Sequence, residues 1–352
     1  MRVLALTRYG RLGPSSRMRT MQFVPGLAGR GIEFVVEPFF RDEYLRSLYS
    51  GRRNVGAIYS GYFRRIGALL AHSRPDAVWL EKEALPWVPW MVEAQLLPRS
   101  IPLIADFDDA VFHRYDMHRS ALVRRLLGRK IDGVMSRASL VLAGNDYLAD
   151  RARSAGAKRV EVFPTVVDLE RYRIERRVAH DRIIVGWIGS PNTARYLKPL
   201  EPVLRMISSD CPGEFVAIGA RQDQLDDELM VAQPWSEDTE VEQLSDLDIG
   251  VMPLSDDPWE RGKCGYKLIQ YMASGLPVVA SPVGVNSDIV SHGETGFLAV
   301  SEHDWADALT RLIRDAGLRR RMGQAGRIRA EKHYSLQVQT PRLERLLRSV
   351  LA

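Results

Sequence analysis

Cysteine is scarce in this sequence, and long apolar runs are missing. Cys211 and Cys264 are the only cysteines among 352 residues, and they lie too far apart for a metal-ligand motif. We therefore expect two reduced thiols in a reducing compartment. No run approaches the roughly 18 apolar residues of a membrane-spanning helix, and the apolar stretch at residues 1–7 is too short for a secretory signal peptide. These absences predict a cytoplasmic protein.

Signatures of two large ligand classes are missing as well. Neither half of the chain contains the G-x-G-x-x-G fingerprint, which argues against a dinucleotide-dependent dehydrogenase. We find no recognition helix, zinc finger or RNA-binding aromatic motif, and therefore expect no nucleic-acid partner. The 45% hydrophobic and 26% charged residues are typical of a soluble globular protein.

Charge is divided unevenly along the chain. Residues 1–160 contain 26 Lys and Arg against 15 Asp and Glu, a balance of +11, whereas the remainder contains 23 against 29, a balance of −6. A basic half suggests an anionic partner for that half alone. An anionic membrane surface fits the cationic cluster at 124–130 and the nearby aromatic residues Trp87, Trp90 and Phe112. A basic solvated face without a partner remains the alternative.

Strand and helix patterns alternate twice along the chain. The predicted strands are 2–7, 31–36, 76–80, 101–105, 140–143, 160–163, 183–189, 214–219, 249–253 and 276–280. A small-residue loop separates the first strand from a predicted helix at 17–29, and Ser15 or Ser16 could cap this helix or face a ligand. Residues 164–173 form the predicted linker. The alternation predicts two tandem doubly wound α/β units.

Carboxylates follow two of the predicted strands in the first half. They are Glu81, Glu83, Asp106, Asp108 and Asp109. Such clusters at strand ends resemble divalent-metal sites, but carboxylates in this position also cap the next element or face an acceptor. We favour capping or an acceptor-facing role, and predict no metal.

Residues 260–296 organise the second half. Gly262 and Gly265 flank Lys263, where side chains would hold the backbone away from a ligand. In the helix predicted at 266–274, helical spacing puts four apolar residues on a buried face: Leu268, Ile269, Met272 and Ala273. It puts three others on the opposite side: Lys267, Gln270 and Tyr271. A glycine loop entering a helix beside lysines is a candidate anion site, although solvated lysines are the simpler explanation.

These motifs resemble the two-domain GT-B nucleotide-sugar glycosyltransferases, in particular the retaining family 4 (group 1). The matching segments are VGWIGSPNT at 185–193, DIGVMPL at 248–254, KCGYKLIQYMASGLPVVAS at 263–281, HGETGFL at 292–298 and HYS at 333–335. The resemblance implies two facing Rossmann-like domains, at 1–168 and 175–335. It also implies a last helix, at about 336–352, that crosses back to the first domain.

The resemblance further implies a nucleotide-sugar donor held in the cleft mainly by the second domain, with no other cofactor. Lys263 and Lys267 would stabilise the diphosphate charge without a metal, and Arg19 would add positive charge beside Arg17. The implied donor-binding residues are Gly13, Ser15, Ser16, Arg17, Gly189, Ser190, Asn192, Arg195, Lys263, Gly265, Tyr266, Lys267 and Gln270.

The sequence departs from this family at three positions. The family usually carries two glutamates eight residues apart, where this chain has Gly262 and Gln270. Glu260 lies two residues before the first of these positions and is the candidate replacement. Asp108 stands nearest to the position of a histidine common in relatives. The pattern K-C-x-x-K-x-x-x-Y from Lys263 resembles a subset associated with bacterial surface polysaccharides.

The leading hypothesis is a retaining transfer of sugar to a lipid-linked or polysaccharide acceptor, at the inner face of the membrane. Front-face attack would pass the acceptor proton to the leaving phosphate, so no strong base is needed. The candidate catalytic residues are Lys263, Asp108 and Glu260. Two alternatives stay open: a sugar-nucleotide epimerase, which needs ionisable groups for proton abstraction, and a scaffold protein without catalysis, suggested by the missing glutamate pair.

Overall fold

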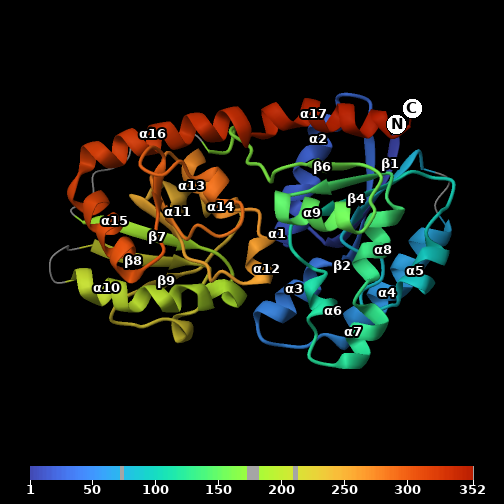
Figure 1. Cartoon of the computed structure of the whole chain (residues 1–352), viewed down its shortest axis with the longest axis horizontal. Coiled ribbons are helices and arrows are strands. Elements are labelled where there is room, and N and C mark those ends of the chain that lie inside the picture. The colour runs from blue at the N-terminus through green and yellow to red at the C-terminus, as the bar shows by residue number, and fades with distance from the viewer. Residues whose placement is uncertain (72–74, 173–181, 209–212, 352) are drawn as a thin grey trace. The chain divides into compact units, whose positions relative to one another are not determined.

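The computed structural model describes residues 1–71, 75–172, 182–208 and 213–351, and it divides into two compact units. Unit 1 comprises Met1–Val166, Arg261–Cys264 and Gln339–Ala352, and unit 2 comprises Val167–Glu260 and Gly265–Val338. Figure 1 labels the elements of both units. Cys211 and the end of the predicted linker at Arg173 lie outside the described residues.

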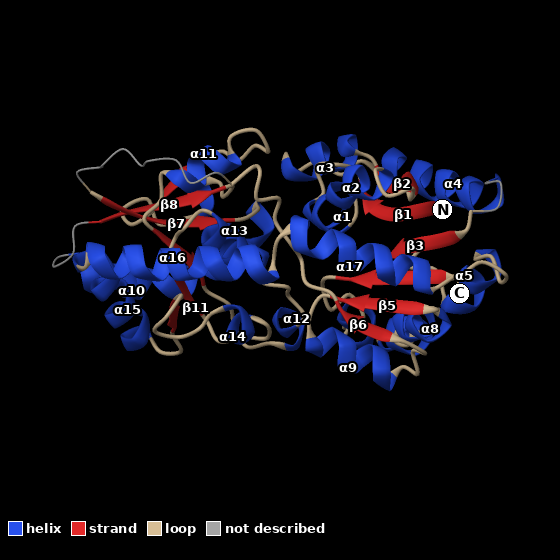
Figure 2. Cartoon of the chain, turned by 90° about the horizontal axis from the view of Figure 1, so that it is seen from above, coloured by secondary structure: helices blue, strands red, loops and turns tan. Residues whose placement is uncertain are grey.

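Six parallel strands form the sheet of unit 1, in the order β2-β1-β3-β4-β5-β6 (Figure 2). Their bounds are β1 Arg2–Tyr9, β2 Glu33–Phe40, β3 Ala77–Glu81, β4 Leu103–Phe107, β5 Leu140–Ala143 and β6 Val160–Val162. The sequence predicts all six, because buried parallel strands are near-continuous apolar runs. Since the carboxyl ends of parallel strands meet at one edge, the segments after β1, β3 and β4 lie close together.

Helices cover both faces of this sheet. They are α1 Pro14–Arg19, η1 Met21–Phe23, α2 Val24–Ala28, α3 Asp42–Tyr49, α4 Val55–Ala71, α5 Trp90–Leu96, α6 His113–Asp116, α7 Ala121–Leu127, α8 Lys130–Arg137, α9 Asp146–Ser154 and α17 Leu336–Ser349. The helices α2 and α17 lie on one side of the sheet, and α4, α5 and α8 on the other (Figure 1). This arrangement agrees with right-handed crossovers between parallel strands.

The last helix, α17, packs on unit 1, as the sequence predicts. Arg348 donates a hydrogen bond of 2.7 Å to the carbonyl of Arg30, which follows α2. Arg342 donates one of 2.9 Å to the carbonyl of Val162 at the end of β6. The final segment of the chain therefore completes the unit that the first segment begins.

The single helix predicted at 17–29 is wrong. The chain forms three short helices there, α1, η1 and α2, and Pro25 lies in the first turn of the last one. Proline lacks the N–H that a continuous helix would need and instead favours the start of a new one.

Unit 2 has a second parallel sheet of six strands, in the order β12-β11-β10-β7-β8-β9. The strands are β7 Ile183–Ile188, β8 Gly213–Ile218, β9 Val231–Gln233, β10 Ile249–Met252, β11 Val278–Ala280 and β12 Gly296–Leu298. The helices are η2 Pro191–Leu200, α10 Glu201–Ser208, η3 Gln222–Gln224, α11 Glu240–Ser245, α12 Pro258–Arg261, α13 Tyr266–Ala273, α14 Asn286–Ile289, α15 Glu302–Arg314 and α16 Ala316–His333. The sequence does not predict β9 and β12, each of only three residues.

The sheet of unit 2 separates two apolar cores. Val185 and Trp187 of β7 face one core, whereas Ile188 of the same strand faces the other. The second core also receives the predicted buried face of α13. Alternate side chains of one strand thus reach opposite helical layers, as in other doubly wound sheets. Within the described residues, no helix is long and apolar enough to cross a membrane.

Candidate functional site

The loop after β7 brings a glycine close to an indole ring. A Cβ atom at Gly189 would lie 2.2 Å from the ring of Trp187, so only glycine fits here without movement. The Gly189 N–H donates to the carbonyl of Ile218 at the end of β8. Ser190 caps η2 reciprocally with Thr193. This loop is therefore held rigidly at the carboxyl edge of the sheet.

The helix α13 begins beside this loop with a second required glycine. Gly265 is its N-cap residue and has a φ of 62°, in the left-handed region. A Cβ there would lie 2.3 Å from Cδ1 of Ile289. Lys267, in the first turn, places its ammonium 4.4 Å from the ring centroid of Trp187. The structure thus brings Gly189 and Lys267 to one buried tryptophan, and Lys267 stands at the positive end of the dipole of α13.

Two residues of α13 do not lie where their helical positions predict. Gln270 and Tyr271 are buried rather than exposed, with 3% and 0% of their surface accessible. Gln270 donates a hydrogen bond of 2.9 Å to the hydroxyl of Tyr172, and burial raises the pKa of Tyr172 well above its ordinary value. The hydroxyl of Tyr271 accepts from the N–H of Ile188. The prediction of an exposed face was wrong because the helix is covered on more than one side.

Glu260 is also buried, inside unit 2. Its carboxylate accepts a hydrogen bond from the hydroxyl of Tyr196, and it lies 3.6 Å from the guanidinium of Arg195. Arg195 itself is 69% exposed, and Asn192 on the same helix is exposed. The role of Glu260 as a substitute for a family glutamate stays a prediction.

In unit 1, a buried lysine gathers the segments after β1, β3 and β4. Lys82 follows β3 with a φ of 66°, which is unusual for a residue other than glycine. Its ammonium lies 2.8 Å from Asp108 Oδ1 and 3.8 Å from Asp109 Oδ2. It also donates a hydrogen bond of 3.1 Å to the hydroxyl of Ser15. The sequence predicts carboxylates at this edge but gives no sign that the lysine between Glu81 and Glu83 joins them.

Opposite charges separate the pKa values of these groups. Burial alone would lower the pKa of Lys82, but Asp108, Asp109 and Glu81 outweigh burial and raise it above its ordinary value. Burial would raise the pKa of Asp108, yet Lys82 outweighs it and holds that pKa below the ordinary range. Burial raises the pKa of Asp109 despite Lys263 nearby. Asp108 is therefore the carboxylate most firmly held in its ionised form.

The residues of the loop after β1 have mainly structural contacts. The N-cap residue of α1 is Gly13, where a Cβ would lie 2.2 Å from Tyr9. Ser16 accepts from the Tyr9 N–H and donates to Glu81 over 2.5 Å, so it does not cap α1. Arg17 is buried and donates to the carbonyl of Arg11. Ser15, in the first turn of α1, joins the charged cluster through its hydrogen bond with Lys82.

Arg19 and Asp106 form a separate buried ion pair. The guanidinium of Arg19 lies 2.5 Å from Asp106 Oδ1, and its side chain is 1% exposed. Arg19 therefore does not add to a solvent-facing anion site, contrary to the prediction. These ion pairs also argue against a metal site here, because the carboxylates of Asp106 and Asp108 each already contact a buried cation. Within the described residues, no group of three or more His, Cys, Asp or Glu is arranged to hold a metal ion.

The segment Arg261–Cys264 clusters with unit 1 by its contacts. The ammonium of Lys263 lies 3.9 Å from Asp109 Oδ1, and its carbonyl accepts from the side chain of Asn145. The thiol of Cys264 donates to the carbonyl of Asp108 over 3.0 Å. A Cβ at Gly262 would lie 2.5 Å from that of Ala110, so a glutamate could not stand there without movement. Of the three predicted catalytic residues, Lys263 and Asp108 therefore meet around the charged cluster of unit 1, and Glu260 lies in unit 2.

Comparison with solved structures identifies the fold. Over 99% of both chains, the protein is similar to a sucrose-phosphate synthase from Thermosynechococcus elongatus, with a TM-score of 0.75 and 15% identity. It is also similar to HepE of Anabaena, solved in complex with UDP-glucose, with a TM-score of 0.71 and 16% identity over 99% of this chain and 100% of the other. Two parallel six-stranded sheets with flanking helices, matched in this way, define the GT-B fold of glycosyltransferases.

Sequence comparisons find similarity over part of the second unit. Residues 200–315 match the family model "Glycosyl transferases group 1", so this GT-B protein contains a segment similar to group 1 glycosyltransferases. A D-inositol 3-phosphate glycosyltransferase of Pseudarthrobacter chlorophenolicus is 40% identical over 86 residues, or 24% of this chain and 19% of the relative. One of Corynebacterium glutamicum is 45% identical over 62 residues, or 17% of this chain and 15% of the relative. The matches span a fifth or less of these relatives.

Proposed function

We propose that the protein is a retaining glycosyltransferase that moves a sugar from a nucleoside-diphosphate sugar to an acceptor. The group 1 segment at residues 200–315 supports this activity, and the structural neighbour HepE was solved with UDP-glucose. We further propose a lipid-linked or polysaccharide acceptor in surface-glycan synthesis, on the cytoplasmic side of the membrane. The basic composition of residues 1–160 supports an anionic surface near that acceptor.

The start of α13 is the observation that carries the proposal. A left-handed glycine, Gly265, opens the helix, and Lys267 lies in its first turn above Trp187. Helix N-termini favour phosphate groups, and a nearby cation adds to this preference. Negative charge grows on the diphosphate as the sugar leaves, so fixed positive charge here stabilises the transition state. Lys263 supplies a second cation in the same mechanism.

Asp108 is suited to orient the acceptor rather than to deprotonate it. Lys82 lowers the pKa of this carboxyl, and a weakly basic carboxylate is a poor general base at neutral pH. It remains a good hydrogen-bond acceptor for a sugar hydroxyl. The proton of that hydroxyl would then pass to the leaving phosphate, in line with front-face attack and retention. The reaction needs no metal in this proposal.

The first test is thermal shift with UDP-, GDP-, dTDP- and ADP-linked sugars and the free nucleotides. A ligand present at about 100 times its dissociation constant stabilises the folded protein by about 2.7 kcal/mol. We expect one nucleotide class to raise the melting temperature. Lys267→Met should remove most of that rise. Lys198 is an exposed lysine on η2, and Lys198→Met should leave the rise unchanged.

A transfer assay separates the proposal from its alternatives. Release of nucleotide coupled to a new glycosidic bond, with the anomeric configuration of the donor, supports the retaining transferase. Nucleotide binding without hydrolysis or transfer would favour a scaffold protein, and a change of sugar configuration in the donor itself would favour an epimerase. No shift with any nucleotide, tested also in the presence of acceptor extracts, would refute the donor site.

A further inference from the structure

The helix α4 exposes the wrong kind of face for an ordinary surface helix. Its inner side packs on the sheet, where a Cβ at Gly61 would lie 2.8 Å from the carbonyl of Phe39 and Arg65 donates to the carbonyl of Glu37. Helical spacing then turns an apolar stripe outwards. The stripe consists of Val55, Tyr59, Phe63 and Leu70, exposed by 55%, 64%, 76% and 71%. The outward face of a surface helix normally carries charged residues, so this exposed apolar stripe indicates a binding surface for a partner.

Neighbouring segments extend the apolar stripe. Tyr62 of α4 donates a hydrogen bond to the carbonyl of Pro86, which ties α4 to the segment before α5. In that region three large apolar residues are exposed: Trp87, Met91 and Val92. The indole of Trp87 in turn contacts the ring of His118, which precedes α7. On α7, Leu122 and Leu126 are exposed by 65% and 58%. We call these residues of α4, α5 and α7 the apolar face.

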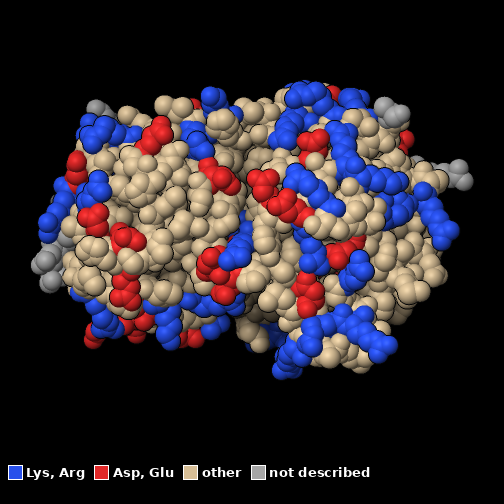
Figure 3. Space-filling view, viewed as in Figure 1, with Lys and Arg blue, Asp and Glu red and all other residues tan. Residues whose placement is uncertain are grey.

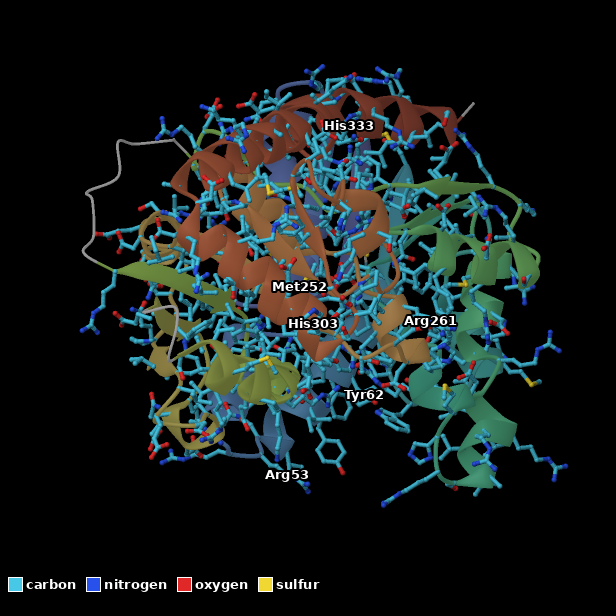
Figure 4. All side chains as sticks on the ribbon, turned by 60° about the vertical axis from the view of Figure 1, so that its left-hand side comes forward. Arg53, Tyr62, Met252, Arg261, His303 and His333 are labelled. Carbon is cyan, nitrogen blue, oxygen red and sulfur yellow. The ribbon has the colours of Figure 1, made fainter. Side chains whose placement is uncertain are left out.

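Cations border the apolar face, and acidic residues are absent from the sequence segments that contain α4 and α7. Residues 44–75 and 117–131 contain no Asp or Glu. The exposed cations are Arg52, Arg53, Arg119, Arg124, Arg125 and Arg129. In Figure 3, Lys and Arg gather over α7, and Figure 4 labels Arg53 and Tyr62 in the lower part of unit 1. Beside α5, a hollow of about 620 Å³ next to Trp90 adds Arg99, Arg137 and Lys158.

From this charge pattern we infer that the apolar face docks on an anionic lipid bilayer. Interfacial helices insert apolar side chains to a depth of roughly 5–10 Å while flanking cations meet anionic headgroups. The face exposes aliphatic and aromatic side chains, which suit the acyl chains of a bilayer. The arginines around it are positively charged and suit the anionic headgroups. The inference deepens the proposed function and rests on it for the lipid-linked acceptor, but lipid binding can be measured without sugar transfer.

The test is co-sedimentation with vesicles of phosphatidylcholine, alone or with about 30% phosphatidylglycerol, an anionic content that gives a negative surface potential. We expect binding to the anionic vesicles and little to the neutral ones. Arg124→Gln/Arg125→Gln should weaken binding about 30-fold, since each arginine near such a surface contributes about 1 kcal/mol, or about a fivefold factor. Phe63→Ser should weaken vesicle binding roughly tenfold, because it removes an aromatic side chain that would be buried in the bilayer.

Unit 2 offers matched controls with similar exposure. Val300 is 79% exposed, close to the 76% of Phe63, and Arg320 and Arg321 are an exposed pair like Arg124 and Arg125. Val300→Ser and Arg320→Gln/Arg321→Gln should leave vesicle binding within about twofold of the original protein, because distant surface substitutions have small effects.

Three outcomes would overturn the inference. The protein could fail to bind anionic vesicles, the unit 2 controls could weaken binding as much as the apolar-face variants, or light scattering could show a dimer that Phe63→Ser dissociates, which would make a second copy the partner. Nucleotide thermal shift on the same samples separates this inference from the proposed function. Nucleotide binding without vesicle binding rejects only the membrane face, and vesicle binding without nucleotide binding rejects only the donor site.

Discussion

Replacing Glu83 with glutamine should destabilise unit 1 more than any surface substitution. The side chain of Glu83 is fully buried and follows the carboxyl end of β3. It lies 2.8 Å from Lys130 Nζ and 3.0 Å from Arg8 Nη1, and it accepts a hydrogen bond of 2.7 Å from the hydroxyl of Tyr115. Lys130 is also fully buried and has one other carboxylate, Glu93, at 2.9 Å.

The size of the effect follows from the charges left behind. Glutamine has nearly the same shape, but it leaves Lys130 and Arg8 buried with Glu93 as the nearest remaining carboxylate to Lys130. Removing one partner of a buried ion pair typically costs about 3–5 kcal/mol. We expect the free energy of opening around β3 to fall by that amount. The exposed Glu43→Gln should change it by about 0.5 kcal/mol or less.

Native-state hydrogen exchange measures this loss locally, which avoids assuming that two units unfold together. The amides of β3 and β4 should lose protection in Glu83→Gln, whereas those of β10 and β11 in unit 2 serve as the internal reference. A loss below about 1 kcal/mol, smaller than the usual cost of breaking a buried pair, would refute the reasoning. Adding Lys130→Met should recover part of the loss, because it removes the net positive charge that Glu83→Gln leaves among the buried groups Arg8, Lys130 and Glu93.

The pH dependence has a defined sign. Burial alone would raise the pKa of Glu83, but Lys130 and Arg8 outweigh it and hold the pKa below its ordinary value of 4.5. A carboxyl whose pKa is lower in the folded state stabilises the protein above its unfolded pKa. The difference between the original protein and Glu83→Gln should therefore be complete at neutral pH and shrink as the pH falls below 4.5. A difference that grows on acidification would contradict the assignment.

Three further predictions concern the candidate site. Lys263→Ala should lower donor turnover roughly 10- to 1000-fold with the fold unchanged, and an unchanged turnover number would remove Lys263 from the mechanism. Gly265→Ala combines left-handed strain of about 1–2 kcal/mol with a clash against Ile289, so the amides of α13 should lose exchange protection. In the control Gly293→Ala a Cβ meets nothing within 4 Å, and the amides near residue 293 should lose less protection. Burial raises the pKa of the Cys264 thiol. In a Cys211→Ser background, alkylation of Cys264 at mildly alkaline pH should therefore be at least about tenfold slower in the folded than in the denatured chain. Equal rates would show that the thiol is accessible.

The sequence predicts the strands of unit 1 and the central strands of unit 2, and misses the two edge strands of unit 2. β5 is buried throughout and coincides with the predicted run at 140–143. β9 and β12 have three residues each, but so do the predicted strands β6 and β11, so length alone does not explain why they are missed. Their position is decided by pairing, since β12 continues the sheet beside β11. Local pattern therefore accounts for the central strands of unit 2, whereas the two edge strands of this sheet depend on contacts that the sequence does not display.

Helical spacing is similarly limited on α13. It correctly places Leu268, Ile269, Met272 and Ala273 in the core. It fails for Tyr271, because a second contact surface comes from Gly250 of β10, where a Cβ would lie 2.3 Å from the tyrosine ring. A glycine distant in sequence thus makes room for a side chain that the helix alone would turn outwards. The buried position of Gln270 likewise depends on Tyr172, 98 residues away.

Charged residues mark the largest gap between sequence and structure in unit 1. A reader of the sequence places Lys82 and Lys130 on the surface, because lysine is almost never fully buried unless paired. The partners of both lysines, Asp108 and Glu83, follow other strands, and only the parallel sheet brings those strand ends to one edge. The same arrangement lowers the pKa of Asp108, which favours the orienting role proposed for it over that of a base. The fold thus sets the protonation of a residue whose position alone the sequence predicts.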